Sequence, residues 1–449
     1  MFTKIVIANR GEIAIRVIRT CRRLGIKTVA VYSEADRTAA HVFLADEAYL
    51  LGAAPVSESY LNGEKLISIA KAAKAEAIHP GYGFLSEQAS FASRCQEEGI
   101  VFIGPSPEII ALMGDKIAAR KAMEAAGFPV IPGTMEAVKN EEEAVDAAAE
   151  IGFPVMLKAA AGGGGIGMEL VRNPIQLKQA FDATRQRASR FFKNGEMFLE
   201  KALEGTRHIE IQLLADHDGH VIHLFERDCS IQRRHQKVIE EAPAASISGP
   251  LGEKIAELAV TAAKQLGYTN AGTIECLVDQ KQNVYFLEMN TRLQVEHPVT
   301  EEVTGLDLVE WQLRIAAGEK LELRQEEIAC TGHALEARIY AEDPETFLPS
   351  PGKITGLLQP QEPYIRHECA VSKGSVVSPF YDPMIAKIIV NGSSRLEAIE
   401  RMKYALRRYQ IEGIKTNLPL LRKVINHHEF SKGNVTTKFI MEHIDNGES

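Results

Sequence analysis

The sequence predicts an α/β protein with α+β parts, and three features of the chain support that class. The first is a strand–helix–strand pattern, with a β-branched run at 4–8, an amphipathic helix at 12–24 and an apolar run at 28–31. Parallel strands joined by helices give such continuous apolar runs, so we expect a Rossmann-like parallel sheet at the N-terminus. The other two features are a glycine run at 162–165 and an alternating acidic segment at 288–296.

The remaining elements follow in order along the chain. In the first helix Ile13, Val17, Ile18 and Cys21 form one stripe, and Gly25 stands where a helix commonly ends. Further helices are expected at 64–74, within 105–132, and at 141–150, 253–266, 395–408 and 418–425. Further strands are expected at 76–79, 100–103, 154–158, 197–201, 208–214, 333–340 and 385–390, with 272–278 and 283–290 paired as a hairpin.

The composition is that of an ordinary globular protein. The chain has 449 residues, 45% of them hydrophobic and 25% charged, which suits about two to four packed domains. The formal charge of −9 gives no bulk attraction to nucleic acid. No run approaches the ~20 apolar residues of a membrane span, and no signal peptide precedes the first strand. The six cysteines lack C-x-x-C spacing, so we expect free thiols and a cytoplasmic location.

The first strand–helix turn reads Ala8-Asn9-Arg10-Gly11-Glu12-Ile13. This is not the G-x-G-x-x-G fingerprint of dinucleotide-binding proteins, so a nicotinamide oxidoreductase loses its main support. We expect a Rossmann-like scaffold whose loop contributes to a site.

The glycine run at 162–165 follows the predicted strand that ends in Lys158. Consecutive glycines let backbone N–H groups approach phosphate oxygens, and Lys158 could reach the same oxygens. No Gly-Lys-Ser/Thr follows, so this is not a Walker A loop. A plain flexible linker is the alternative, but the lysine favours a phosphate-binding, mobile lid.

The alternating segment places polar side chains on one face of an extended chain, because alternate residues of a strand share a face. These side chains are Glu288, Asn290, Arg292, Gln294 and Glu296, with a bend possible near Pro298. Arg292 can hold an oxyanion by a two-pronged contact, and Glu296 is placed for general-base work.

A metal site is expected beside this face. If the hairpin turn centres on Lys281 and Gln282, Glu275 falls opposite Glu288. Like charges in that position destabilise a sheet, and a bound cation would remove the penalty. Two carboxylates and the Asn290 amide suit Mg²⁺ or Mn²⁺. A solvated polar strand face is the alternative.

The densest basic run, 227–237, is expected to be a cationic loop. It lacks interleaved aromatic residues, and Glu240 and Glu241 follow it, which disfavours nucleic acid. We expect an anion site using His235 and Lys237, with a solvated surface run as the alternative. Arg338, on the later alternating strand, would by itself more often be a structural ion-pair partner.

Together these segments resemble biotin carboxylases, which belong to the ATP-grasp superfamily. The matching runs are 7–14, 78–87, 113–116, the glycine run, 226–243, 288–301, 341–344, 347–350 and 413–417. The resemblance covers nearly the whole chain, and the run Glu288 to Pro298 is highly specific.

The resemblance implies a division of the chain. The implied parts are an N-terminal Rossmann-like domain (1–104), a helical linker (105–131), an ATP-grasp lid subdomain (132–203), an ATP-grasp catalytic core (204–329) and a C-terminal mixed α+β domain (330–449).

The resemblance also implies roles for individual residues. The ATP-binding set is Lys116, Lys158, Gly163, Gly164, Gly165, Glu200, Leu203, His208, Gln232, His235, Glu275 and Glu288. The metal ligands are Glu275, Glu288 and Asn290, and the bicarbonate holders are Lys237, Arg292, Gln294 and Val295. Tyr82, Gly83 and Arg338 would bind biotin, and Glu296, Arg292, Arg338 and Lys237 would be catalytic.

The implied reaction carboxylates biotin with bicarbonate and ATP through carboxyphosphate, with two Mg²⁺ or Mn²⁺ ions. The chain has no Met-Lys-Met-like hairpin for biotin attachment, since Met402-Lys403 lies on a predicted helix. We therefore expect the biotin carboxyl carrier protein and the carboxyltransferase to be separate chains. A homodimer is implied by the resemblance alone, and the downstream acyl acceptor stays open among acetyl-CoA, propionyl-CoA, pyruvate and others.

One position departs from the family pattern. Many relatives carry Lys or Arg where this chain has Ile166, so we expect a changed affinity for ATP and not a loss of activity. The nearest rival function is another ATP-grasp ligase, forming carbamoyl phosphate or a purine precursor. A non-catalytic ATP-binding regulator is a rival of another class.

Overall fold

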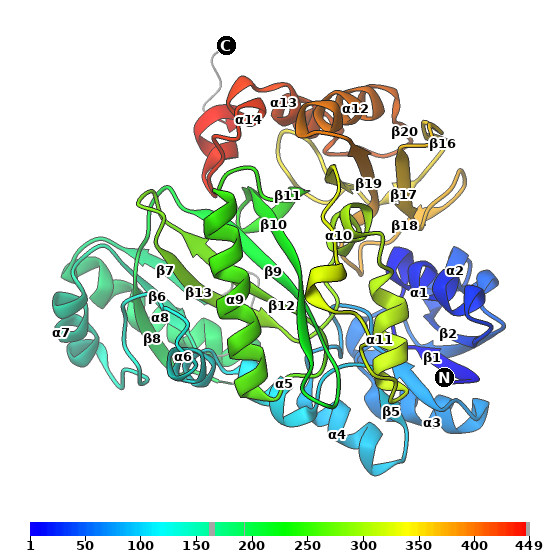
Figure 1. The fold of residues 1–449 in the computed structure, drawn as a ribbon, viewed down its shortest axis with the longest axis horizontal. Coiled ribbons are helices and arrows are strands. Elements are labelled where there is room, and N and C mark those ends of the chain that lie inside the picture. Colours follow the sequence, from blue (N-terminus) through cyan, green and yellow to red (C-terminus); the bar gives the residue numbers. More distant parts are fainter. Residues whose placement is uncertain (161–166, 193, 446–449) are drawn as a thin grey trace.

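The computed structural model describes residues 1–160, 167–192 and 194–445. Figure 1 shows a central sheet with a smaller, helix-covered sheet on one side and the N-terminal sheet on the other. The C-terminal helices lie at the top of the view, against the C-terminal strands of the central sheet. The α/β class with α+β parts is confirmed.

The N-terminal sheet is parallel throughout, as predicted. Its strands are β1 (Lys4–Ile7), β2 (Lys27–Ser33), β3 (Glu47–Gly52), β4 (Ala77–His79) and β5 (Val101–Phe102), in the order β3-β2-β1-β4-β5. The helices are α1 (Gly11–Arg23), α2 (Ala40–Leu44), α3 (Gly63–Ala73) and α4 (Ala89–Glu97). The side chains of Ile5, Val6 and Ile7 are fully buried, as expected of a central parallel strand.

The central sheet has eight strands in the order β13-β12-β9-β10-β11-β14-β19-β17. They are β9 (Arg207–Ala215), β10 (Val221–Arg233), β11 (Gln236–Ala242), β12 (Asn270–Val278), β13 (Val284–Asn290), β14 (His333–Tyr340), β17 (Ile365–Cys369) and β19 (Met384–Gly392). Every pairing is antiparallel, including the predicted hairpin of β12 and β13. The sheet therefore runs continuously from the predicted catalytic core into the C-terminal part.

Helices cover this sheet. They are α9 (Gly249–Leu266), α10 (His297–Thr304), α11 (Leu308–Ala316), α12 (Arg395–Arg408), α13 (Leu418–Asn426) and α14 (His428–Ser431). Apolar residues of α9 pack on β9 and β12, and those of α12 and α13 pack on β14 and β19. Two small sheets, β15 (Gly352–Lys353) with β18 (Val376–Val377) and β16 (Gly356–Leu358) with β20 (Gln410–Glu412), complete the C-terminal part.

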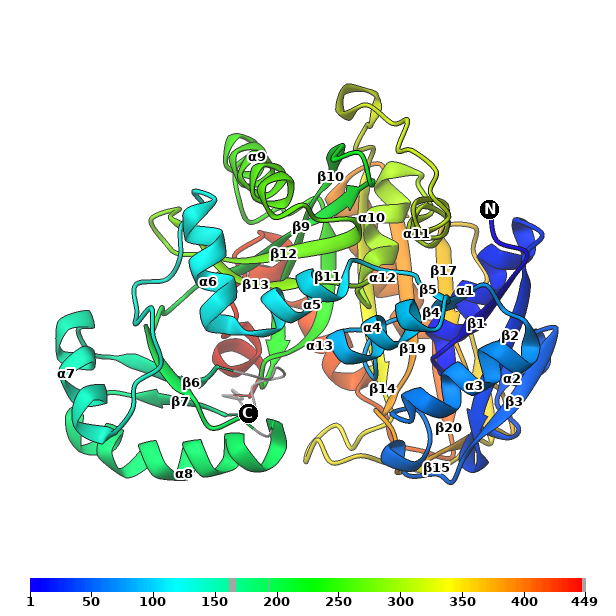
Figure 2. The ribbon, with the colours of Figure 1, turned by 90° about the horizontal axis from the view of Figure 1, so that it is seen from below.

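The lid forms a separate three-stranded sheet in the order β7-β6-β8. It contains β6 (Val155–Ala159), β7 (Met168–Val171), β8 (Met197–Lys201), α7 (Glu141–Ile151) and α8 (Pro174–Phe192). The sequence analysis did not predict α8, although Leu177 and Phe181 on it are buried against the sheet. Figure 2 shows α5 (Pro107–Gly114) and α6 (Lys116–Ala125) lying between the N-terminal sheet and the lid.

Two predictions of local structure were wrong. The expected cationic loop at 227–237 is the hairpin of β10 and β11, whose turn is made by Arg234 and His235 at φ 50° and 66°. Its basic side chains stay in strands because buried carboxylates neutralise them. The alternating strand ends at Asn290 and does not extend to Glu296; a turn at 291–296 leads into α10.

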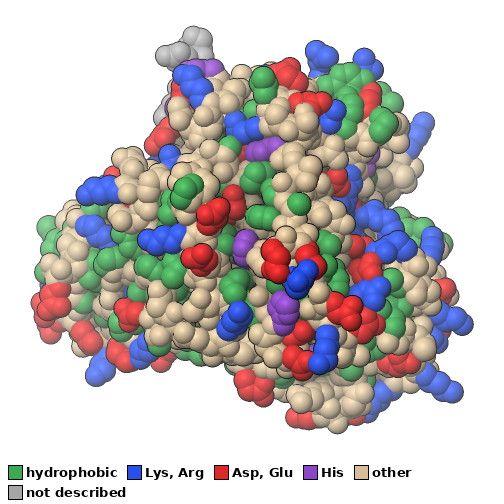
Figure 3. All heavy atoms as spheres, viewed as in Figure 1, with side chains coloured by type: hydrophobic (Ala, Val, Ile, Leu, Met, Phe, Trp, Pro, Cys, Tyr) green, Lys and Arg blue, Asp and Glu red, His purple; other side chains and the backbone are tan. Residues whose placement is uncertain are grey.

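Acidic and basic side chains are interspersed over the molecular face in Figure 3. Among the helices of the described residues, none combines the length and the apolar character needed to cross a membrane.

Arg16 ties α1 to α10 and α11. Its guanidinium donates to Glu301 at 2.6 Å and to Asp307 at 2.8 Å, and its side chain is 3% exposed. Arg16→Met removes the buried cation that Glu301 and Asp307 share, while Arg366 still pairs with Glu301 and Arg23 with Asp307. The free energy of unfolding should therefore fall by about 3 kcal/mol, the low end of the range for breaking a buried ion pair. Urea denaturation measures this.

The control is Arg23→Met. Arg23 binds Asp307 from the same helix, but its side chain is 53% exposed, so the loss should stay below about 1 kcal/mol. Equal losses for the two variants would contradict the assigned role of burial.

Candidate active site

Three buried carboxylates share one ammonium group at the centre of the candidate site. Lys237 Nζ lies 2.6 Å from Glu210 Oε2, 2.7 Å from Glu275 Oε1 and 2.6 Å from Glu296 Oε1. An ammonium has three donors, so all of them are used. Burial opposes ionisation of both Glu275 and Glu296. Lys237 and His208 together outweigh burial at Glu275, and Lys237 with Arg338 and Arg227 outweighs it at Glu296, so the pKa of each lies below its ordinary value.

The antiparallel register brings these acids together. Glu210 on β9 is opposite Glu275 on β12, and Glu275 is in turn opposite Glu288 on β13. The predicted pairing of Glu275 with Glu288 is confirmed. A row of three like charges across a sheet needs cations to offset their repulsion.

Glu288 is the member of this row without a cation of its own. No described residue forms a hydrogen bond or ion pair with its carboxylate, unlike those of Glu210 and Glu275. Burial raises the pKa of Glu288, the charge of Glu275 adds to the rise, and Lys116 opposes it.

These donors fit a divalent cation. Glu288 offers a free carboxylate, and Asn290 lies beside it with its amide nitrogen 2.9 Å from Glu275 Oε1. Ligand atoms of His208, Glu210 and Glu275 also all lie within 4.8 Å of one another. Oxygen-rich sets of this kind suit Mg²⁺ or Mn²⁺. Asn290 and Glu288 lie next to this cluster and are not part of it.

Arg227 was not predicted to be a site residue, but its hydrogen bonds hold several residues of the site in place. It is fully buried and donates to Gln294 at 2.5 Å, to Gln212 at 2.8 Å, to Thr300 at 2.9 Å, and also to Glu210. One guanidinium thus joins β9 to the turn before α10. The signal that could have found it was the alternation His208, Glu210, Gln212, which puts polar side chains on one face of β9.

The turn at 291–296 brings together the polar side chains that the predicted strand was expected to align on one face. Gln294 Nε2 donates to Glu275 at 2.7 Å, and Glu296 accepts from Lys237 at 2.6 Å and from Arg338 at 2.8 Å. Arg292 instead donates to Glu87 at 2.8 Å and to Asn290 at 2.7 Å. The polar side chains gather because the chain bends, and not because they alternate.

Arg338 binds Glu240 at 2.5 Å as well as Glu296, so it lies beside the turn. Lys387, also missed from the sequence, donates to the Val295 carbonyl at 2.6 Å and lies 3.2 Å from Glu12. Tyr82 donates to the same Glu12 carboxylate. Gly83 follows Tyr82 with φ 69° and open space where a side chain would be.

The other sequence-predicted residues lie toward the lid. Lys158 and Arg120 both bind Glu200, which is 4% exposed. His208 accepts from Gln232 at 2.8 Å, and its Nε2 is 2.9 Å from Glu275. Burial lowers the pKa of Lys116.

Two predicted residues are less enclosed, and others fall outside the described chain. Leu203 is half-buried just after β8, and His235 is exposed at the hairpin turn. Gly163, Gly164, Gly165 and Ile166 lie outside the described residues.

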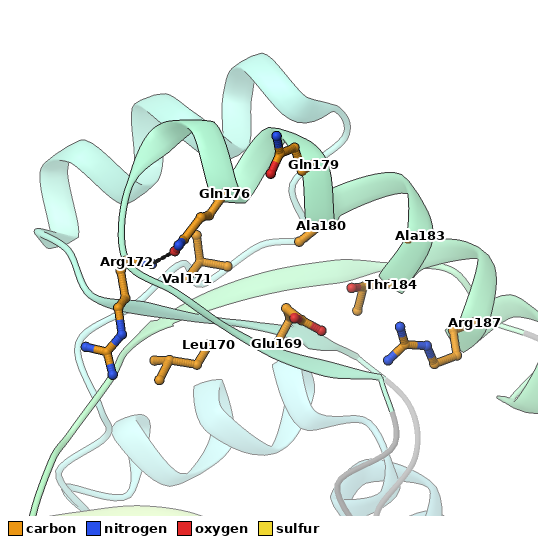
Figure 4. A pocket seen from close by; sticks show the side chains of 10 residues that line it. All are labelled: Glu169, Leu170, Val171, Arg172, Gln176, Gln179, Ala180, Ala183, Thr184 and Arg187. Atoms are coloured by element: carbon orange, nitrogen blue, oxygen red, sulfur yellow. Dashed lines mark hydrogen bonds between the residues drawn. The ribbon is translucent and has the colours of Figure 1, made fainter.

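A separate hollow of 440 Å³ lies between β7 and α8 (Figure 4). Its lining includes Glu169, Arg172, Thr184 and Arg187. None of its ten lining residues is among the sequence-predicted site residues, so the candidate active site is elsewhere.

Known families match nearly the whole chain. Residues 1–110 match the family described as "Biotin carboxylase, N-terminal domain", and residues 336–442 match "Biotin carboxylase C-terminal domain". Residues 115–324 match "Carbamoyl-phosphate synthase L chain, ATP binding domain".

Individual relatives agree with these matches. The chain is 64% identical to biotin carboxylase 2 of Bacillus subtilis (strain 168), over 99% of this chain and 100% of the relative. It is 62% identical to the biotin carboxylase of Halalkalibacterium halodurans, over 99% and 98%.

Solved structures are also similar. The biotin carboxylase domain dimer of the Hydrogenobacter thermophilus 2-oxoglutarate carboxylase, in complex with MgADP, ADP and bicarbonate, matches with a TM-score of 0.97 at 50% identity, over 99% of this chain and 98% of that one. The biotin carboxylase of Campylobacter jejuni in its β-γ-ATP complex matches with a TM-score of 0.97 at 46% identity, over 99% of each chain.

Removing the shared ammonium should make stability depend on pH in a defined direction. In Lys237→Met, repulsion raises the pKa values of Glu275 and Glu296 above the ordinary value of about 4.3. A group with a raised folded-state pKa contributes stability below its unfolded pKa and loses it as the pH rises through the folded pKa. The gap in unfolding temperature between wild type and variant should therefore be larger at about pH 8 than at about pH 5.

The metal-free proteins are compared by thermal unfolding. Lys121→Met is the control, because Lys121 pairs with Glu136 at the surface, where both side chains are exposed. The difference in unfolding temperature between wild type and Lys121→Met should not change with pH. A Lys237→Met gap that is constant, or larger at the lower pH, would contradict the assigned sharing of charge.

Proposed function

The chain belongs to the biotin carboxylase family, and we infer from that membership that it carboxylates biotin with bicarbonate in an ATP-dependent reaction. The observation within the site that best supports this function is the ionised Glu296, held between Lys237 and Arg338. Glu296 lies between the proposed nucleotide and metal side of the site, on β9, β12 and β13, and the side where Arg338 and Tyr82 lie.

The first step of this reaction needs a base and residues that hold bicarbonate. We assign Glu296 as the base that accepts the proton of bicarbonate as a bicarbonate oxygen attacks the γ-phosphoryl group of ATP, giving carboxyphosphate and ADP. Because its pKa is low, Glu296 is ionised before bicarbonate arrives. Arg292, Lys237, Gln294 and the Val295 backbone are assigned to hold bicarbonate.

The nucleotide is assigned to the lid side of the site. Lys116, Lys158, His208 and Gln232 would contact ATP, with Glu200 and Arg120 fixing the position of Lys158. Glu275, Glu288 and Asn290 would hold Mg²⁺ or Mn²⁺, whose charge neutralises the phosphate oxygens. Leu203, His235, Gly163, Gly164 and Gly165 stay in the proposed nucleotide set by resemblance.

The second step transfers carbon dioxide to biotin and completes the first half-reaction of a biotin-dependent carboxylase. Carboxyphosphate breaks into carbon dioxide and phosphate, phosphate takes the ureido proton, and the ureido nitrogen attacks carbon dioxide. Arg338 would offset the negative charge on the ureido oxygen, with Tyr82 and Gly83 beside the ring. Glu12 supports the placement of Tyr82, since its carboxylate accepts from the tyrosine hydroxyl.

The wider assembly is also part of the proposal. We place biotin on a separate carrier protein, with a separate carboxyltransferase subunit, in keeping with relatives named as carboxylase subunits. A homodimer is supported by the dimer described for the Hydrogenobacter thermophilus domain. Six free thiols support a reducing, cytoplasmic setting. The division at 104, 131, 203 and 329 is likewise proposed.

ADP release tests the function. With MgATP, release should require bicarbonate and rise with free biotin, and chelation of the metal should abolish it. Arg338→Met should lose the increase with biotin, because no guanidinium offsets the charge on the ureido oxygen. Arg314→Met should behave as wild type, because Arg314 on α11 pairs with Glu310 on the same helix and with Glu319 just after it, outside the site.

ATP cleavage that ignores both bicarbonate and biotin would contradict the proposal. Cleavage that needs bicarbonate but never responds to biotin would instead favour another ATP-grasp ligase.

A further inference from the structure

A second set of buried charges adjoins the site on strands β11, β14 and β19. Its members are Glu240, Glu336, Arg338 and Lys387, none more than 8% exposed. On β14 the odd-numbered side chains pack into the C-terminal core. The even-numbered ones, Glu336 and Arg338, therefore face the site.

Glu336 faces another carboxyl group. It lies directly opposite Glu240 in the β11–β14 pairing, and both side chains are fully buried. Arg338 lies opposite Lys387 in the next pairing. Side chains opposite each other on an antiparallel pair share a face and lie close together. Two carboxyl groups placed in this way cannot both ionise unless each has its own cation.

The nearby cations already bind other groups. Arg338 donates to Glu240 at 2.5 Å and to Glu296 at 2.8 Å. Lys387 donates to the Val295 carbonyl at 2.6 Å and lies 3.2 Å from Glu12. Among the described residues, neither oxygen of Glu336 has a hydrogen-bond partner.

An unpartnered, fully buried carboxyl group takes up a proton, because a lone buried charge is the costlier state. Burial raises the pKa of Glu336 well above its ordinary value; Lys387 opposes this, and the charge of Glu240 adds to it. Burial also raises the pKa of Glu240, to about 7, but Arg338 opposes that rise and donates directly to Glu240. Glu336 has no such partner, so the proton of the pair goes to Glu336. The charged groups that face Glu336 are Glu240 from β11, Arg338 from its own strand, Lys387 from β19 and Glu296 from the start of α10. A protonated Glu336 has one O–H to donate, and Oε2 of Glu240 is an acceptor without a partner.

We propose that Glu336 is a positioning residue for the biotin half-reaction: as a neutral acid it donates to Glu240, which in turn fixes the guanidinium of Arg338. This rests on the proposed function, in which Arg338 faces the ureido oxygen. A neutral Glu336 steadies Glu240 without adding negative charge beside Arg338. An ionised Glu336 would compete for the guanidinium and offset the charge that biotin needs.

Two substitutions separate the neutral acid from a charged one. Glu336→Gln keeps a neutral donor of the same shape, whereas Glu336→Leu removes the donor. Glu336→Gln should keep kcat/KM for free biotin within about 3-fold of wild type. Glu336→Leu should lower kcat for biotin at least about 10-fold, because a misplaced guanidinium loses transition-state contact. In both variants the KM for ATP should match wild type, because the proposed nucleotide contacts lie on the other side of Glu296.

Infrared difference spectroscopy tests the proton directly. Wild type minus Glu336→Gln at neutral pH should show the C=O stretch of a protonated carboxyl group. Glu342→Gln is the matched contrast, because buried Glu342 is held by both terminal nitrogens of Arg233. Its difference spectrum should show a carboxylate band and no acid band.

The proposal is overturned if Glu336→Gln is as impaired as Glu336→Leu, if Glu336→Leu carboxylates biotin like wild type, or if the acid band is missing. If Glu336→Leu does not fold, Glu336→Gln and its spectrum still decide. A wild-type enzyme that ignores biotin would overturn the proposed function, whereas the infrared band would still report the protonation of Glu336.

Discussion

One ammonium group, that of Lys237, allows three buried carboxylates to occupy the same site. Each of the three donors of Lys237 lies on a different acid, and the three acids come from β9, β12 and the start of α10. A buried acid is normally driven to protonate, yet Glu275 and Glu296 stay ionised because Lys237, together with the other partners of each acid, outweighs burial. The site can therefore offer one carboxylate to a metal ion and another carboxylate as a proton acceptor at neutral pH.

The sheet register and two buried arginines place the other charged groups of the site. The antiparallel register lines up Glu210, Glu275 and Glu288, and Arg227 beneath them fixes the turn that carries Gln294. Because β14 and β19 continue the same sheet, Arg338 reaches Glu296 from the other side. The proposed base thus lies between the proposed nucleotide side and the proposed biotin side, where both steps of biotin carboxylation would need it.

Much of this could be predicted from the sequence, because local patterns determine it. The β-branched runs predict the parallel N-terminal sheet, and the spacing from Glu275 to Glu288 predicts their register. Other features depend on tertiary charge pairing. The run 227–237 looked like a loop because nothing local shows that Arg227 and Arg233 bind buried acids. The turn after Asn290 and the burial of Lys387 were missed for the same reason, since contacts with distant elements override local propensity. The helix α8 is different, because Asn173 caps its start and Leu177, Phe181 and Ala188 follow at helical spacing, so the local pattern was sufficient to predict it.

The central claim is that Glu296 is the base which lets bicarbonate attack ATP. The most direct measurement is transfer of ¹⁸O from labelled bicarbonate into phosphate, for wild type and Glu296→Gln at saturating MgATP. Wild type should transfer the label, whereas Glu296→Gln, which still binds the nucleotide, should transfer almost none. A Glu296→Gln enzyme that moves label into phosphate at the wild-type rate would contradict the central claim.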